Sequence, residues 1–200
     1  MEFLAATNNA HKLAEMRRIL ESQGHTVKSL ADAGLCIEPE ETGATFAENA
    51  AIKASATCAV AGLPAIADDS GLEVDALAGA PGVYSARFAG PHATDAANNE
   101  KLLRLLKDVP AEHRTARFTS AIALVLPSGA QLETEGHCPG TIGFAPQGEN
   151  GFGYDPLFYV GGSSFAQMSA AEKDAVSHRA RALAAFAAQL PAFLAANATE

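Results

Sequence analysis

A chain of 200 residues with 48% hydrophobic content is long enough to bury a substantial core, which excludes a disordered segment. Its formal net charge of -9 argues against a general nucleic-acid binder, because phosphate backbones are held mainly by clustered lysine and arginine side chains. An anionic small molecule is compatible with this charge if a locally positive pocket or a divalent cation receives it.

The cysteines and the apolar segments indicate the cellular compartment in which the protein is expected. The three cysteines, Cys36, Cys58 and Cys138, are odd in number and widely spaced, which favours neither a disulfide framework nor a zinc site. The start, MEFLAATNN, has no basic segment before a long apolar run, and a proline interrupts the apolar stretch at 181–198. A membrane span needs roughly 20 uninterrupted apolar residues. We therefore expect a cytoplasmic protein with no membrane contact.

The chain begins with a strand followed by a helix. Residues 2–6 are expected to form a short buried strand. The spacing of Leu13, Met16 and Leu20 predicts an amphipathic helix that ends near Gly24.

The middle of the chain predicts a capped helix and a strand. Thr45 and Glu48 match a capping box, which opens a helix over 46–61. Residues 64–67 then enter a strand that is expected to stop at an aspartate pair, and the alternation at 72–77 predicts that a strand resumes there.

The second half continues this mixture of helices and strands. The pattern predicts a helix over 95–107, two strands at 115–126 and 130–138 joined by a hairpin turn, and a helix from about 177 onward. Because strands and helices interleave without a linker or a repeat, the whole chain is expected to be one α/β or mixed α+β domain.

The segment TNNAHK at 7–12 lies where the first strand passes into the first helix. Free N–H groups and the positive end of a helix dipole make such a junction suitable for an anion, and Lys12 would add a positive charge. The alternative is that Asn9 only caps the helix and that Lys12 is solvated.

Two pairs of adjacent acids lie at chain turns. Glu40 and Glu41 precede the capped helix, and Asp68 and Asp69 follow an apolar strand. Side-by-side carboxylates repel unless a positive charge lies between them, and their hard oxygen atoms suit Mg²⁺. The alternatives are an exposed acidic loop for the glutamates and a hydrogen-bonded turn for the aspartates.

Two later segments could contact a flat ligand. In GENGFGYDP at 148–156, glycines allow close backbone approach, Phe152 could stack on a base, and Asp155 could hydrogen-bond its edge. Such a segment can equally be a glycine-rich turn whose aromatic rings pack in the core. The segment at 172–181 supplies further polar and cationic groups, which by themselves also fit a solvated basic face.

Taken together, these segments resemble the inosine triphosphate pyrophosphatase family, which acts on non-canonical purine nucleoside triphosphates. The resemblance covers almost the full length, and its motifs occur in the family's order. They are T-x-N-x-x-K at 7–12, E-E-T-G-x-T-F-x-E-N-A-x-x-K-A at 40–54, P-A-I-A-D-D-S-G-L at 64–72, G-A-P-G-V-Y-S-A-R at 79–87, G-F-G-Y-D-P at 151–156 and S-H-R at 177–179.

The resemblance implies Mg²⁺-dependent hydrolysis of ITP, dITP and XTP to the monophosphate and pyrophosphate. Glu41 and Asp69 would bind the metal, Asp69 would orient or deprotonate the attacking water, and Asp68 would support it. The residues that would hold the triphosphate are Thr7, Asn9, Lys12, Lys53 and Ser70.

The same resemblance assigns a second set of residues to the purine base. Phe152 would stack on the base, and Gly153 and Tyr154 belong to the same motif. The residues that would read the base edge are Asp155, Lys173, His178 and Arg179, with Arg87 as a further contact. Donors facing the 6-oxo group of hypoxanthine or xanthine would be left unpaired by adenine, which disfavours ATP.

The resemblance also implies a homodimer and an α/β fold whose mixed, elongated β-sheet is flanked by helices in two lobes with a central cleft. Two other functions are compatible with parts of the pattern. A Maf-like pyrophosphatase would share the phosphate-binding end but lack the base-reading segments. A non-catalytic nucleotide-binding regulator would have lost acidic or basic residues that this chain retains.

Overall fold

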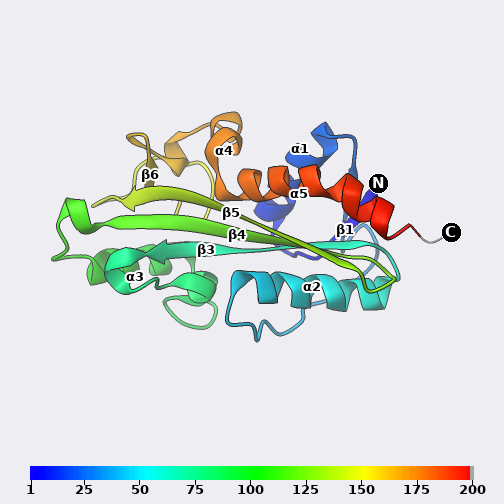
Figure 1. The fold of residues 1–200 in the computed structure, drawn as a ribbon. Helices are drawn as coiled ribbons and strands as arrows, with labels where there is room; N and C mark the ends of the chain where they lie inside the picture. Colours follow the sequence, from blue (N-terminus) through cyan, green and yellow to red (C-terminus); the bar gives the residue numbers. More distant parts are fainter. Residues whose placement is uncertain (199–200) are drawn as a thin grey trace. The chain divides into compact units, whose positions relative to one another are not determined.

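The structure is a computed structural model that describes residues 1–198. Strands and helices alternate along the chain (Figure 1). The strands are β1 (Glu2–Ala5), β2 (Thr26–Ser29), β3 (Ala65–Val74), β4 (Thr115–Val125), β5 (Gln131–Ile142), β6 (Phe158–Val160) and β7 (Ser163–Ser164). The α-helices are α1 (Ala10–Ser22), α2 (Phe46–Ala61), α3 (Asp95–Leu105), α4 (Ala170–Val176) and α5 (His178–Ala196). Short 3-10 helices are η1 (Asp75–Leu77), η2 (Gly82–Arg87), η3 (Ala111–His113) and η4 (Phe165–Gln167).

The strands form one mixed seven-stranded sheet in the order β2-β1-β3-β4-β5-β6-β7. Strand β1 pairs in parallel with both β2 and β3, whereas β6 pairs antiparallel with β5 and with β7. Helix α1 joins β1 to β2, and α1, β2 and α2 lie between β1 and β3 in the sequence, so both parallel pairs have the long connection that parallel pairing requires. The expected mixed α/β fold with helices flanking the sheet is confirmed.

The chain divides into two compact units that exchange segments. Unit 1 comprises Met1–Asp69, Ser120–Gly136 and His178–Glu200, and unit 2 comprises Ser70–Thr119 and His137–Ser177. The chain therefore changes unit inside β3, β4 and β5 and again between α4 and α5. The expectations that the whole chain acts as one enzyme domain and that a cleft separates two lobes stay predictions.

Unit 1 has helices on both faces of its strands. Helices α1 and α5 lie on one face and α2 lies on the other (Figure 1). The first face buries an apolar cluster that includes Phe3, Met16, Ile66 and Phe186, all without solvent exposure. Burial of such side chains supplies the main driving force for this packing, about 1.5–3 kcal/mol for each large apolar side chain.

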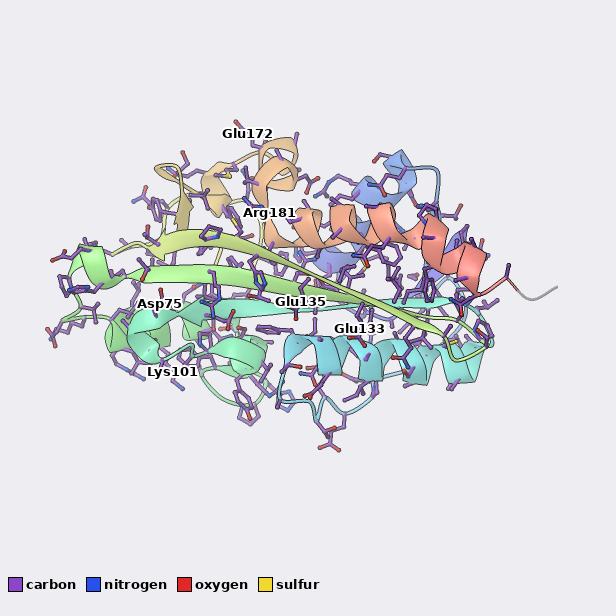
Figure 2. All side chains as sticks on the ribbon, viewed as in Figure 1. Asp75, Lys101, Glu133, Glu135, Glu172 and Arg181 are labelled. Atoms are coloured by element: carbon purple, nitrogen blue, oxygen red, sulfur yellow. The ribbon has the colours of Figure 1, made fainter. Side chains whose placement is uncertain are left out.

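Unit 2 has a core rich in aromatic side chains. The rings of Phe118, Phe158 and Phe165 pack together, with centroids 4.7 Å apart for the first two and 5.0 Å apart for the last two. Buried side chains of β3, β4, β5 and α3 complete this cluster, including Leu72 and Leu102. Helix α4 begins with a capping box in which Glu172, labelled in Figure 2, accepts hydrogen bonds from Ser169.

Helix α2 has the bounds that the sequence predicts. The Thr45 hydroxyl accepts from the Glu48 backbone N–H at 3.2 Å, and the Glu48 carboxylate accepts from the Thr45 N–H at 3.2 Å. Gly62 ends the helix in a left-handed conformation with φ of 65°, which favours glycine.

Strand β3 differs from the prediction. Rather than stopping at the aspartate pair, it runs without a break from Ala65 to Val74, and η1 begins at Asp75, inside the strand predicted at 72–77. The prediction gave weight to the local turn tendency of aspartate, serine and glycine, whereas pairing with neighbouring strands keeps the segment extended. Because successive side chains of a strand point to opposite faces, Asp68 and Asp69 face different sides of the sheet.

Other boundaries shift by a few residues. The helix predicted at 95–107 ends at Leu105, the strand predicted at 130–138 continues to Ile142, and the last helix begins at His178. The short strands β2, β6 and β7 were not predicted from the sequence. Among the described residues, no helix is long and apolar enough to cross a membrane.

Candidate active site

Asp68 is the centre of a buried charge cluster in unit 1. Its carboxylate lies 2.8 Å from the Lys12 ammonium and accepts hydrogen bonds from Arg179 Nε at 3.0 Å and from the Ser120 hydroxyl at 2.6 Å. Arg179 also pairs with the Glu15 carboxylate, and its side chain is only 1% exposed. Helices α1 and α5 and strand β4 thus all direct polar groups at one acid of β3.

These partners keep Asp68 ionised. Burial alone would raise the pKa of the Asp68 carboxyl, but the positive charges of Arg179 and Lys12 outweigh it and hold that pKa well below its usual value. In the same way, burial would lower the pKa of Arg179, and the carboxylates of Asp68 and Glu15 raise it instead. Asp68 is therefore a permanently charged, fully paired group at neutral pH.

Asp69 belongs to a second cluster on the opposite face of β3. The Lys53 ammonium lies 2.9 Å from Asp69 Oδ1 and 2.7 Å from Glu41 Oε1, so one positive charge joins the two acids. The Asn49 side chain donates to Asp69 Oδ2 at 3.3 Å. Asn49 and Lys53 are four residues apart on α2, which places both on one face of the helix.

The electrostatic environment of Asp69 differs from that of Asp68. Burial raises the pKa of Asp69, and the nearby Glu41 raises it further, while Lys53 and Lys12 lower it only in part. The pKa of Lys53 is raised: burial lowers it, and the two carboxylates more than offset that effect. Asp69 is thus an incompletely neutralised acid, which is a common property of groups that take part in catalysis.

The segment before α1 forms a tight polar turn in unit 1. Asn9 caps the helix, its side-chain oxygen accepting from the backbone of His11 at 3.0 Å and of Lys12 at 3.1 Å. The Thr7 hydroxyl accepts from the Asn9 N–H at 3.1 Å. The capping role is therefore confirmed, and because Lys12 pairs with Asp68, its side chain is held rather than solvated.

A third group of predicted residues lies in unit 2. Asp155 is 2% exposed, and its Oδ2 accepts from Lys173 Nζ at 2.6 Å and from the Phe152 N–H at 2.9 Å. The Lys173 ammonium lies 5.0 Å from the centre of the Phe152 ring, within the range of a cation–π contact. This arrangement gathers an aromatic ring, a carboxylate and an ammonium group at one turn.

Glycine is required at the start of this turn. Gly151 has φ of +77°, and a Cβ there would lie 2.0 Å from Asp155 Oδ2. The Tyr154 hydroxyl donates to the Ser85 carbonyl at 2.9 Å, and its burial raises the pKa of the phenol. Tyr154 therefore anchors the turn with a neutral side chain. Arg87 ends η2, and its guanidinium lies 5.2 Å from the centre of the exposed Tyr84 ring.

The predicted residues thus lie in both units of the chain. Unit 1 contains Thr7, Asn9, Lys12, Glu41, Lys53, Asp69, His178 and Arg179. Unit 2 contains Ser70, Arg87, Phe152, Gly153, Tyr154, Asp155 and Lys173. Buried His178 and Arg179 begin α5, and Arg179 contacts the acids of unit 1. Their assignment to the base edge stays a prediction.

The structure adds polar residues that the sequence did not single out as site residues. Glu15 and Ser120 complete the surroundings of Asp68, and Asn49 contacts Asp69. The helical spacing of Thr45, Asn49 and Lys53 was a usable signal for Asn49, since it places the three side chains on one polar face of α2. For Glu15 and Ser120 no local pattern was available, because Glu15 pairs with Arg179 and Ser120 donates to Asp68, and each partner is more than fifty residues away in the sequence.

The fit of a metal ion can be judged from the acidic groups. Residues 1–198 contain no group of three or more histidine, cysteine or acidic side chains arranged to hold an ion. Glu41 and Asp69 nevertheless surround one cationic group, and both present hard oxygen atoms. Mg²⁺ often binds through one or two carboxylates together with substrate phosphates and water, so this pair fits it.

The protein has a mixed α/β fold in which acids and lysines cluster around strand β3. Comparison with known proteins shows the family to which it belongs. The family model described as the Ham1 family matches residues 3–189, so the chain belongs to the Ham1 family. This confirms the resemblance found in the sequence.

Individual relatives agree with this assignment. The chain is 56% identical over 185 residues to the dITP/XTP pyrophosphatase of Nocardia farcinica, covering 90% of each chain. It is 50% identical over 196 residues to the dITP/XTP pyrophosphatase of Exiguobacterium sibiricum, covering 97% of this chain and 99% of the relative. The solved structure of the Staphylococcus aureus Ham1 protein matches with a TM-score of 0.85 at 39% identity, covering 96% of this chain and 99% of that one.

Proposed function

We propose that this protein is a Mg²⁺-dependent pyrophosphatase that hydrolyses dITP, XTP and ITP to the nucleoside monophosphate and pyrophosphate. The observation that carries the proposal is the shared ammonium of Lys53 between Glu41 and Asp69, in a chain that belongs to the Ham1 family. Relatives named dITP/XTP pyrophosphatase cover at least nine tenths of the chain and support the substrate class.

The groups around Asp69 are suited to a polyphosphate. Phosphoryl transfer depends mainly on positioning and on stabilising negative charge, so no covalent nucleophile is needed. Lys53 and Lys12 would bind phosphate oxygens, and Glu41 and Asp69 would hold Mg²⁺. When bound, that ion neutralises charge on the phosphate oxygens and helps to orient the substrate.

Asp69 is the best candidate to hold and deprotonate the attacking water. A general base is most effective when its pKa lies closer to the working pH, and burial raises the pKa of Asp69 in that direction. Asp68 is unsuited to this role, because Arg179, Lys12 and Ser120 already occupy its oxygen atoms. We assign Asp68 to holding Lys12 in place.

The turn at 151–155 would bind the purine. Phe152 offers a ring on which a base can stack, and Lys173 offers a donor that suits a 6-oxo group. Adenine presents an amino donor at that position, so the buried donors of the protein would be left unpaired. Such a mismatch can lower kcat/KM for the wrong base by a factor on the order of 10⁴.

The proposal is tested by measuring pyrophosphate release from dITP, XTP, ITP, dGTP and dATP, each with and without Mg²⁺. We expect release from the first three only when Mg²⁺ is present, and much slower release from dATP. Equal kcat/KM for dATP and dITP would contradict the base assignment and favour a broader, Maf-like pyrophosphatase. Binding of dITP without any turnover would favour a nucleotide-binding regulator.

A further inference from the structure

Gly153 is held at both of its backbone polar groups by side chains of α3. Its N–H donates to Asp95 Oδ2 at 2.7 Å, and its carbonyl accepts from Asn99 Nδ2 at 2.8 Å. Asp95 and Asn99 are four residues apart, so they lie one above the other on one face of the helix. We call these two side chains the Gly153 clamp.

The clamp acts at the middle of the turn that carries Phe152 and Asp155. Gly153 has φ of +62°, a left-handed conformation that glycine adopts readily. Within the turn, the Phe152 N–H donates to Asp155 Oδ2 at 2.9 Å and the Asp155 N–H donates to the Phe152 carbonyl at 3.2 Å. Because these bonds join the residues on either side of Gly153, displacement of its peptide groups moves the Phe152 ring and the Asp155 carboxylate together.

Within residues 1–198, Asn99 is a buried polar residue with one unsatisfied side-chain atom. Its side chain is buried, and its Oδ1 has no hydrogen-bond partner among the described residues. A buried acceptor without a partner is unfavourable, and such groups in native proteins call for an explanation. The Nδ2 bond to Gly153 explains why an amide is retained at this buried position.

The same helix fixes a second segment through other residues. Asn98 accepts from the Ala89 N–H at 2.7 Å and donates to the Ala86 carbonyl at 3.0 Å. Lys101, labelled in Figure 2, donates to the Phe88 carbonyl. Helix α3 therefore fixes the backbone around Arg87 with one pair of side chains and the turn at 151–155 with another.

We propose that Asp95 and Asn99 are positioning residues that set the purine specificity of the turn at 151–155, an inference that rests on the proposed function. Neither side chain is assigned to contact the substrate. They hold the peptide groups of Gly153 so that Phe152 and Asp155 keep the spacing that the base requires. Small misplacements of binding groups can change rates by as much as about 100-fold.

The test compares four variants with the wild-type protein. Asn99→Ala and Asp95→Ala each remove one arm of the clamp, whereas Asp95→Asn keeps an acceptor oxygen. Glu100→Ala is the matched control, since Glu100 lies on the same helix and is exposed. Steady-state kinetics on dITP and dATP are combined with amide hydrogen exchange of residues 151–155.

For Asn99→Ala and Asp95→Ala we expect KM for dITP to rise about tenfold with little change in kcat, which is the kinetic pattern of lost ground-state binding. The preference for dITP over dATP should fall, and exchange at 151–155 should become faster. Asp95→Asn should restore wild-type KM, and Glu100→Ala should behave as wild type. An unchanged KM and preference in both alanine variants would overturn the proposal.

Failure of the proposed function is distinguishable from failure of this inference. If the wild-type protein releases no pyrophosphate from any purine triphosphate, the proposed function is wrong, and exchange alone then decides whether the clamp orders the turn. If the wild type is active and only the clamp variants fail to differ from it, the inference is wrong and the function stands. Asp95 is exposed at the start of α3, so its variants are expected to fold even if Asn99→Ala does not.

Discussion

Two neighbouring aspartates have opposite electrostatic surroundings. Asp68 is matched by Arg179, Lys12 and Ser120, whereas Asp69 is matched incompletely by Lys53 and Asn49. The difference arises because the two side chains face different sides of one strand. It explains why a chain can place these acids side by side without a large repulsion, and why the proposed function assigns the role of base to Asp69 rather than to Asp68.

For Asp69→Asn we expect loss of most pyrophosphate release with little change in the free energy of unfolding. Under the proposed function the amide removes a base and a metal ligand, but Lys53 keeps its bond to Glu41, so no buried charge is left unpaired. Steady-state kinetics and urea unfolding measure the two effects. Glu38→Gln is the control, because Glu38 is exposed in the loop between β2 and α2, and this variant should keep the wild-type activity. Near-normal turnover of Asp69→Asn would show that another group is the base.

The stability of the protein should depend on Asp68 in acid. Its pKa in the folded protein is below the ordinary value of 3.8, so its stabilising effect is complete above that pH and is lost as pH falls through the folded pKa. Asp68→Asn lacks this titration. We therefore expect its unfolding free energy to be lower at neutral pH but to decline less on acidification, as urea unfolding between about pH 5 and about pH 3 can measure. Parallel curves for the two proteins would contradict this prediction.

At the scale of the elements, α5 packs unusually closely against β5. A Cβ at Gly136 would lie 2.3 Å from both the Ala182 nitrogen and the His178 carbonyl oxygen. The Thr134 hydroxyl donates to the Ala182 carbonyl at 3.0 Å, which fixes the helix over this strand. The contact involves backbone atoms on both sides, so rotation of a flexible side chain cannot relieve it.

Gly136→Ala is therefore expected to lower the free energy of unfolding by about 1–3 kcal/mol, the usual cost of overpacking. Because α5 carries Arg179, the Asp68 cluster should be disturbed as well. Chemical denaturation measures the loss. Glu133→Ala is the matched control, because Glu133 is exposed on the same strand and is labelled in Figure 2. Equal stability of the two variants would mean that the helix shifts without cost.

The elements that sequence patterns predicted best are those with strong local signals. Helix α2 was predicted over about 46–61 from the capping box that begins it, and the structure has it at Phe46–Ala61. Strand β3 was cut short in the prediction, because aspartate and glycine favour turns locally while its pairing partners are distant in sequence. Strands β6 and β7 have three and two residues and depend on pairing with each other, so no periodicity could indicate them.

Contacts within the candidate site were predictable where helical spacing or a family motif indicated them. Lys53 and Asn49 lie on one face of α2, and both reach Asp69, as the spacing of four residues suggests. The Gly153 clamp was not predictable, because it joins side chains of α3 to the backbone of a turn more than fifty residues later. Glu15 was missed for the same reason, since only the folded chain brings it to Arg179.

The whole molecule is divided into two units that share strands rather than a linker. The chain leaves one unit and enters the other within β3, β4 and β5, so neither unit is one continuous piece of sequence. Hydrogen-bonded strands transmit unfolding from one part to the next more readily than a loop does. We therefore expect the two units to unfold in one cooperative transition, despite their separate cores.

This expectation can be checked with two fluorescent reporters, because the chain has no tryptophan. Phe193→Trp reports on the unit 1 core and Phe88→Trp on the unit 2 core, both at partly buried positions. The urea midpoints of the two variants should coincide with each other and with the loss of circular dichroism. Separate midpoints within one variant, one for fluorescence and one for circular dichroism, would show that the units unfold independently.

The uninterrupted path of β3 restricts which insertions and deletions the sequence can accept in this strand. Insertion or deletion of one residue upstream of position 68 within the strand would turn each acid toward the opposite face of the sheet and away from its present partners. Loops tolerate insertions more readily than a strand does, because a strand has to keep its register. The number of residues in β3 is thus as strictly determined as the identity of its two acids.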